Sequence, residues 1–348
     1  RVLRNDGRGT ISDVIAGLDW VVQNHAQHNI KAINMSLGKA VEVEAALDPL
    51  VIATEAVWDA GVAVIASAGN YGHLGYFHIT SPGNSPKIIT VGSVTDKGTV
   101  SEADDFVSSF SSKGPTGIDS FMKPDILAPG NRFVAPISKH AHFKTSLANA
   151  ATFDCGGNCA GEYLEMSGTS MAAGVVSGAV MLMLADEPGL NPATIKARLM
   201  RSARKLDIDP IIAGAGVLDV KAALKETGTV NVALSPKMIP SPDGTGVMIQ
   251  DTSEVWENPH FSNGNLYTNG SAWSESDAEA NSYLWSDSYL WSDSFLWSDS
   301  FLWSDSTTAS DDNVDRAMTT SEALPPAEDR IPDAPAQRTS DDMLEEAR

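Results

Sequence analysis

Cysteine is scarce in this chain, with 2 residues among 348. That number excludes a framework of several disulfides and a zinc site built from two cysteine pairs. Basic residues are also few, because 24 Lys and Arg stand against 45 Asp and Glu, and the formal net charge is −21. Such an acidic chain is unsuited to nucleic acid or to an anionic membrane surface. No apolar run reaches the roughly 18 residues of a membrane span. We therefore expect neither nucleic acid nor a membrane as a partner.

Hydrophobic residues make up 42% of the chain, enough for a sizeable core. Helical and strand patterns alternate along it. Ser12 is expected to cap a first amphipathic helix. Segments 62–67 and 87–94 are apolar on both faces, which is typical of central parallel strands. Asn191-Pro192 supplies an N-cap and a first helical residue. The alternation predicts an α/β fold, with a mainly parallel sheet covered by helices on both faces.

A candidate nucleophile stands in Gly168-Thr169-Ser170-Met171-Ala172, directly before a small, apolar stretch, 173–185, that is expected to be helical. The N-terminus of a helix leaves backbone N–H groups unpaired, and these can stabilise an oxyanion. A serine in this place is also a common N-cap, so the motif alone would not identify an enzyme.

Four further motifs precede this one in order: Ile33-Asn34-Met35-Ser36-Leu37-Gly38, Ala66-Ser67-Ala68-Gly69-Asn70, Phe110-Ser111-Ser112-Lys113-Gly114-Pro115 and Ala128-Pro129-Gly130. Together the five motifs resemble the subtilases, the subtilisin-like serine peptidases. The resemblance extends over residues 1–225. It implies a subtilisin-like three-layer α/β sandwich and an endopeptidase that acts on protein or peptide substrates through an acyl-enzyme.

The resemblance also implies site residues. Ser170 would be the nucleophile, and Asn70 would donate its side-chain amide to the oxyanion together with the Ser170 N–H. The stretch Ser36, Leu37 and Gly38 would pair with an extended peptide substrate. Ala68 and Gly69 would form one wall of the pocket for the residue before the scissile bond. Thr80 would lie at the floor of that pocket, in a Thr-Ser-Pro segment where the family often has a cis proline.

Two motifs of the family are missing from the sequence. In subtilases the catalytic Asp lies in a D-T/S-G motif and the His in an H-G-T motif, and both precede the Ser. This chain begins Arg1-Val2-Leu3, without Met, and contains neither motif. We therefore interpret it as the C-terminal part of a longer precursor, with an incomplete sheet, and expect it to be inactive alone. His73 is the one histidine expected near Ser170, but no group that would orient it as a base is evident.

The chain departs from the family pattern after the nucleophile, where Gly174 replaces a proline in Ala172-Ala173-Gly174. We expect this glycine to loosen the first turns of the helix by about 1 kcal/mol.

The two cysteines, Cys155 and Cys159, lie four residues apart with two glycines between them. The resemblance favours a local disulfide in a secreted or extracellular protein. A pair of free thiols, or half of a metal site, is the alternative. No cofactor is expected and no metal ligand is assigned. Structural calcium is frequent in the family, but its ligands cannot be placed in this sequence.

Four regions are expected along the chain. Residues 1–225 would be the C-terminal two-thirds of a catalytic domain, and 226–281 a linker or small extension. Residues 282–306 contain four copies of a hexapeptide of the type Tyr-Leu-Trp-Ser-Asp-Ser. Because six is an even period, an extended strand would place Tyr or Phe, Trp and Asp of every copy on one side and Leu and the serines on the other. A flexible spacer is an equal alternative. Residues 307–348 would be an acidic, disordered tail.

Three classes of function follow from these observations. The first is a secreted, monomeric serine endopeptidase whose Asp and His lie upstream of this fragment. The second is a degenerate subtilase that binds peptides without cleaving them. The third is a structural or adhesive protein built around the repeat. Upstream D-T/S-G and H-G-T motifs would separate the first class from the second.

Overall fold

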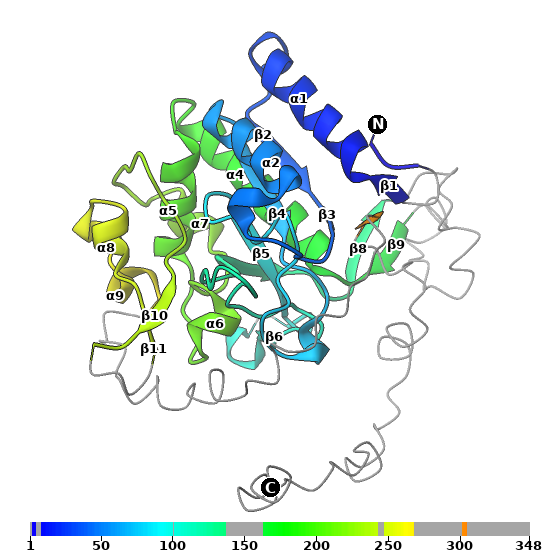
Figure 1. The fold of residues 1–348 in the computed structure, drawn as a ribbon. Coiled ribbons are helices and arrows are strands. Elements are labelled where there is room, and N and C mark those ends of the chain that lie inside the picture. The colour runs from blue at the N-terminus through cyan, green and yellow to red at the C-terminus, as the bar shows by residue number, and fades with distance from the viewer. Residues whose placement is uncertain are drawn as a thin grey trace, which may run out of the picture. The chain divides into compact units, whose positions relative to one another are not determined.

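The computed structural model describes residues 2–4, 8–99, 101–136, 163–242, 247–267 and 301–304. The chain divides into two compact units, Arg1–Ala309 and Ser310–Arg348, and every described residue belongs to the first. Figure 1 draws the described residues as a coloured ribbon. Cys155 and Cys159 lie outside the described residues, as do 307–348. The disulfide and the character of the tail therefore stay predictions.

The central sheet contains five strands: β2 (Ala32–Met35), β4 (Ala63–Ser67), β5 (Ile89–Thr95), β6 (Phe106–Val107) and β7 (Ile126–Pro129). Strands β2, β4, β5 and β7 are parallel, with β5 pairing both β4 and β7. Only β6 is antiparallel, at the end of β5. Strand β4 is buried along its whole length, which explains why segment 62–67 is apolar on both faces.

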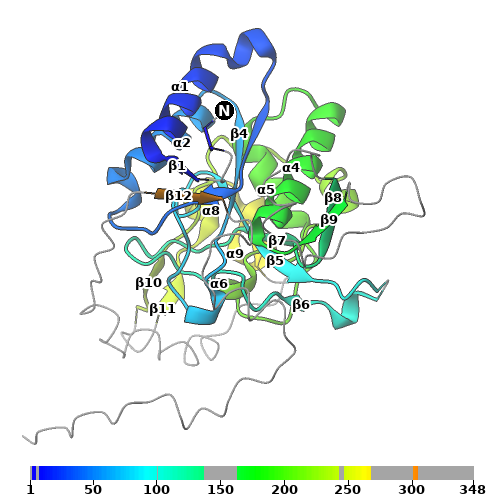
Figure 2. The same cartoon turned by 90° about the vertical axis from the view of Figure 1, so that its right-hand side faces the viewer.

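Helices cover both faces of this sheet. Helices α1 (Ile11–His28) and α2 (Pro49–Asp59) lie on one side, and α4 (Thr169–Asp186) and α5 (Pro192–Ser202) lie on the other (Figure 2). The three-layer α/β arrangement predicted from the sequence is confirmed. Short elements complete the unit: β1 (Arg8–Thr10), β3 (Leu37–Gly38), β8 (Phe133–Pro136), β9 (Tyr163–Met166), α6 (Pro210–Ala213), α7 (Val220–Ala223), β10 (Met238–Pro240), β11 (Val247–Ile249), α8 (Thr252–Val255), α9 (Asn263–Leu266) and β12 (Phe301–Ser304).

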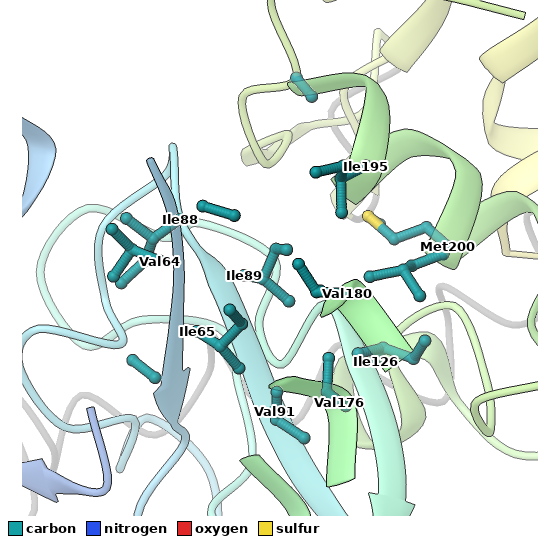
Figure 3. Close-up of a cluster of buried hydrophobic side chains, with 14 of the residues drawn as sticks. Val64, Ile65, Ile88, Ile89, Val91, Ile126, Val176, Val180, Ile195 and Met200 are labelled. Carbon is teal, nitrogen blue, oxygen red and sulfur yellow. The ribbon is translucent and has the colours of Figure 1, made fainter. Parts of the chain in front are cut away.

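Helix α4 lies at the centre of the packing. It contacts β2, β4, β5 and β7. Val176 and Val180 of α4 meet Ile65, Ile89 and Ile126 of the strands (Figure 3). Among the described residues, α4 is the one helix that is long and apolar enough to cross a membrane, and half of its span is buried in the protein. Its apolar composition is thus explained by its place in the core.

The first helix begins two residues earlier than the sequence suggested. Thr10, and not Ser12, is the N-cap of α1. The Thr10 hydroxyl accepts a hydrogen bond from the Asp13 N–H at 3.2 Å, while the Thr10 N–H donates to the Asp13 carboxylate at 3.4 Å. This reciprocal capping box satisfies two backbone donors, which a cap at Ser12 would not do.

Residues beyond 225 form a packed extension in the parts that the structure describes, 226–242 and 247–267. Strands β10 and β11 pair antiparallel. Trp256, Phe261 and Tyr267 are buried in the main core cluster. The Trp256 Nε1–H also donates to the Leu234 carbonyl at 2.6 Å. These three aromatic residues thus join the described part of this region to the core.

A buried ionic cluster lies beneath β5 and β7. Asp125 is fully enclosed, with Lys123 Nζ at 2.7 Å from one carboxylate oxygen and Lys196 Nζ at 3.1 Å from the other. Because two ammonium groups share one carboxylate, a fully ionised cluster would hold one uncompensated positive charge. Burial lowers the pKa of Lys196 to about 7, with Asp125 opposing that shift and Lys123 adding to it.

Candidate active site

Ser170 is the second residue of α4, at the end of the helix that faces the carboxyl ends of the strands. Gly168 is the N-cap, and its N–H donates to the Gly130 carbonyl at 2.8 Å. A Cβ at Gly130 would lie 2.7 Å from the Gly168 oxygen, so only glycine permits this approach. Ser170 is buried, and its Oγ has no hydrogen-bond partner among the described residues. Within the described part of the chain, no hydrogen bond of this hydroxyl would therefore compete with a base.

Asn70 is tied to the start of the same helix. Its Oδ1 accepts the Thr169 N–H at 2.9 Å and the Thr169 hydroxyl at 3.1 Å. The Thr169 Oγ1 in turn accepts the Gly69 N–H at 3.2 Å. These bonds join the turn after β4 to the N-terminus of α4. They also orient the planar carboxamide, whose oxygen accepts and whose nitrogen is a hydrogen-bond donor.

The turn that carries Asn70 depends on glycine. Gly69 has φ +105°, a conformation that other residues rarely adopt. A Cβ at Gly69 would also lie 2.8 Å from Thr80 Cγ2 and 2.9 Å from Ser112 Oγ. Ser112 stabilises the turn, because its N–H donates to the Gly69 carbonyl at 2.9 Å.

The expected substrate-binding stretch meets the nucleophile helix. The Ser36 hydroxyl donates to the Ser170 carbonyl at 2.9 Å, and Asn34 Nδ2 donates to Ser36 Oγ at the same distance. Leu37 and Gly38 form β3 directly after this contact. Ser36 therefore ties β3, the candidate peptide-binding strand, to the start of α4.

The expected pocket residues lie together as well. The Thr80 N–H donates to the Ala68 carbonyl at 3.0 Å. A Cβ at Gly38 would lie 2.8 Å from Thr80 Oγ1, so β3 and the Thr80 segment are in close contact. The Ser81–Pro82 peptide bond is cis, as the resemblance implied. Ser36, Leu37, Gly38, Ala68, Gly69 and Thr80 are thus brought to one region beside Ser170.

No histidine hydrogen-bonds the Ser170 hydroxyl in the part of the chain that the structure describes. His73 lies exposed in the short 3-10 turn Gly72–Leu74, and no carboxylate is recorded in an ion pair with it. His28 stacks on Trp20 at the end of α1. His140 and His142 fall outside the described residues. In the described part of the chain, the candidate nucleophile Ser170 and the candidate amide donor Asn70 thus lie together, and no histidine is hydrogen-bonded to Ser170.

Thr169 is the residue whose role sequence reasoning missed. It is fully buried and hydrogen-bonded to both Gly69 and Asn70, although the sequence suggested no function for it. A small β-branched residue before the serine was the available signal. Its partners could be identified only from the fold, because they lie about a hundred residues away along the chain.

Comparison with known proteins agrees with this geometry. Residues 1–229 match the model of the subtilase family. The chain belongs to the subtilase family. Serine protease AprX of Bacillus subtilis (strain 168) is 38% identical over 230 residues, which cover 64% of this chain and 49% of AprX. Subtilisin DY of Bacillus licheniformis is 29% identical over 224 residues, which cover 64% of this chain and 66% of that protein.

Among solved structures, fervidolysin from Fervidobacterium pennivorans, described as a keratinolytic enzyme related to subtilisin, aligns with a TM-score of 0.47 and 21% identity. The alignment covers 68% of this subtilase and 32% of fervidolysin. The chain spans about half the length of AprX and two thirds of that of subtilisin DY.

Proposed function

We propose that this subtilase is a serine endopeptidase in which Ser170 Oγ is the nucleophile. The Asp and His of the triad would lie in a segment N-terminal to Arg1. The observation that carries the proposal is the hydrogen-bonded unit of Asn70, Thr169 and Ser170 at the N-terminus of α4. An amide fixed in this way can stabilise an oxyanion without reorganising during the reaction.

The chemistry follows from this arrangement. Ser170 Oγ would add to the carbonyl carbon of the scissile bond while its proton passes to the imidazole of the upstream His. The oxyanion would accept hydrogen bonds from the Asn70 side-chain amide and the Ser170 N–H. When the intermediate collapses, the C–N bond breaks and the leaving amine takes the proton from the imidazole. Water then hydrolyses the acyl-enzyme by the same steps.

The open edge of the sheet supports an upstream segment. Among the described residues, β2 pairs only with β4. Parallel sheets are usually covered and extended on such edges. On α4, Met181 and Leu182 are 50% and 54% exposed, although the helix otherwise packs in the core. Further strands and helices could join β2 and cover these side chains.

The substrate would be a peptide in extended conformation, bound along β3 by backbone hydrogen bonds. We infer that the protein is secreted, since its relatives include an extracellular serine proteinase of Thermus sp. (strain Rt41A), which is 34% identical over 200 residues. A monomer would suffice, because the residues proposed for this half of the site come from one chain.

The test uses the protein encoded by the complete reading frame. We expect it to hydrolyse a chromogenic peptide and Ser170→Ala to abolish turnover. Ser202→Ala, at the end of α5, is the matched control and should leave turnover unchanged. Turnover that survives Ser170→Ala would overturn the proposal.

A non-catalytic peptide-binding subtilase is the second candidate. It is favoured by the lack of a histidine beside Ser170 among the described residues and by Gly174 in place of the family's proline. The same experiment separates the two candidates. A complete protein that binds peptides but does not cleave them, with or without Ser170, would establish the second.

A further inference from the structure

Strand β12 (Phe301–Ser304) lies between β1 and β3 and completes a three-stranded antiparallel sheet. Gly9 of β1 is opposite Leu302, and Gly38 of β3 is opposite Trp303. Figure 2 shows β12, in orange, next to β1. The strand comes from the fourth copy of the hexapeptide repeat.

The position of β12 coincides with the expected place of a substrate. Its neighbour β3 consists of Leu37 and Gly38, which are two of the candidate substrate-binding residues. Ser304 is opposite Leu37, and the pairing is antiparallel. The C-terminal end of β12 is therefore directed toward Ser36, whose hydroxyl binds the Ser170 carbonyl at 2.9 Å. A peptide in this place runs along β3 toward Ser170.

We propose that the hexapeptide repeat is the chain's own ligand for the strand position between β1 and β3, where it competes with peptide substrates. The proposal rests on the proposed function for the place of the substrate, and adds an occupant and a form of regulation. Backbone pairing on both sides provides the binding, as in other cases of strand addition.

The repeat suits this role in two ways. Its period of six is even, so every copy presents the same residues to the same side of an extended strand. All four copies share Leu-Trp-Ser-Asp, and any of them could replace the fourth between β1 and β3. In addition, only residues 268–300 separate the packed extension from β12. A short covalent connection gives an effective concentration that reaches the millimolar range when it spans the two sites.

Hydrogen exchange in the whole chain tests the occupancy. Deletion of residues 282–306 should speed amide exchange in Arg8–Thr10 and Leu37–Gly38 by at least tenfold. Deletion of 310–334, of the same length but within the acidic tail, should not change it. A second variant keeps the length of the chain and replaces the tryptophan of every copy with proline, which removes one N–H per copy. Its substitutions are Trp285→Pro, Trp291→Pro, Trp297→Pro and Trp303→Pro. Equal protection in all four proteins would overturn the proposal.

A binding experiment tests the competition. A fluorescein-labelled Tyr-Leu-Trp-Ser-Asp-Ser peptide should bind the chain lacking residues 282–306 at least tenfold more tightly than the intact chain, as followed by anisotropy. A scrambled peptide is the control. Equal affinity for both chains, or no preference over the scrambled peptide, would contradict the proposal. Neither experiment requires hydrolysis, so loss of the proposed catalytic function would leave both results interpretable.

Discussion

At the scale of single residues, Ser170 is positioned by its neighbours and not by bonds to its own hydroxyl. Its carbonyl is held by Ser36, while Thr169 beside it is held by Asn70 and Gly69. The candidate nucleophile is therefore fixed through the backbone, and its Oγ has no hydrogen-bond partner among the described residues. The same bonds hold Asn70 at the helix N-terminus, where negative charge is favoured.

Asn70 can be tested by two substitutions in the complete protein. Asn70→Ala should lower kcat about a hundredfold or more with little change in KM, because the amide acts on the oxyanion of the transition state. Asn70→Asp keeps an oxygen acceptor for Thr169 and removes the N–H donor. We expect the same loss of kcat in steady-state kinetics. If Asn70→Asp keeps nearly full kcat, Asn70 only supports the structure.

Lys205 gives a prediction about stability and pH. Its Nζ donates to the carbonyls of Met200, Ala215 and Leu266, and no carboxylate is recorded in an ion pair with it among the described residues. Burial, and then the neighbouring charge of Arg201, lower the pKa of Lys205 to about 7. Between pH 7 and 10 a larger fraction of Lys205 is protonated in the unfolded chain than in the folded chain. The free energy of unfolding should then rise with pH, and below pH 7 this contribution should level off.

Urea denaturation at pH 7, 8 and 9 measures this slope. Lys205→Met should reduce it by about 1 kcal/mol per pH unit. Lys196, whose pKa is also about 7, should leave a remaining slope in the variant. An unchanged slope would mean that the three carbonyls keep Lys205 protonated in the folded protein.

At the scale of elements, helix α4 packs tightly against the sheet but contains two glycines at which a side chain would have room. A Cβ at Gly174 or Gly178 would meet nothing within 4 Å. Glycine in a helix interior costs about 1 kcal/mol relative to alanine. Gly174 therefore weakens the helix that carries Ser170 without serving a close contact among the described residues.

Gly174→Ala should thus raise the free energy of unfolding by about 1 kcal/mol, seen as a higher Tm. Gly69→Ala is the opposing control. It should lower Tm, since Gly69 has φ +105° and a Cβ there would lie 2.8 Å from Thr80. Destabilisation by Gly174→Ala would show that this face of α4 is covered by residues outside the described part of the chain.

Much of this element level could be predicted from the sequence. The apolar run of β4 and the cap at Asn191 of α5 are local signals, and both elements form as predicted. The N-cap of α1 was predicted at the wrong residue, because Thr10 and Ser12 are both good N-caps. Only the reciprocal hydrogen bonds with Asp13 decide between them. The burial of Lys123 and Lys196 was not predictable, since it depends on a carboxylate that the fold brings to both.

At the scale of the whole molecule, the subtilase match and the folded unit end at different places. The family model ends at residue 229, whereas the core includes residues up to Tyr267. For residues 226–281 the sequence left a linker and a small extension open, and Trp256 and Phe261 of this segment are buried in the core. Sequence motifs pointed to Ser170 as the nucleophile and to Leu37 and Gly38 as substrate contacts, which stay predictions, whereas the place of β12 between β1 and β3 required the structure.

Truncation tests where the folded unit ends. In the complete protein, a chain ending at 267 should keep its thermal stability apart from the contribution of β12. A chain ending at 229 should lose several kcal/mol or fail to fold, because Val230, Trp256 and Phe261 are buried in the core. Thermal unfolding followed by circular dichroism compares the two. Equal stability would mean that residues 230–267 are dispensable.

The central claim is that Ser170 is the reactive nucleophile of the complete protein. A fluorophosphonate probe, followed by peptide mass spectrometry, tests it most directly, because phosphonylation requires an activated serine and an oxyanion site. We expect one adduct, located on Ser170, which is lost in Ser170→Ala and greatly slowed in Asn70→Ala. An adduct on another serine, or none in a folded protein with an upstream Asp and His, would contradict the account.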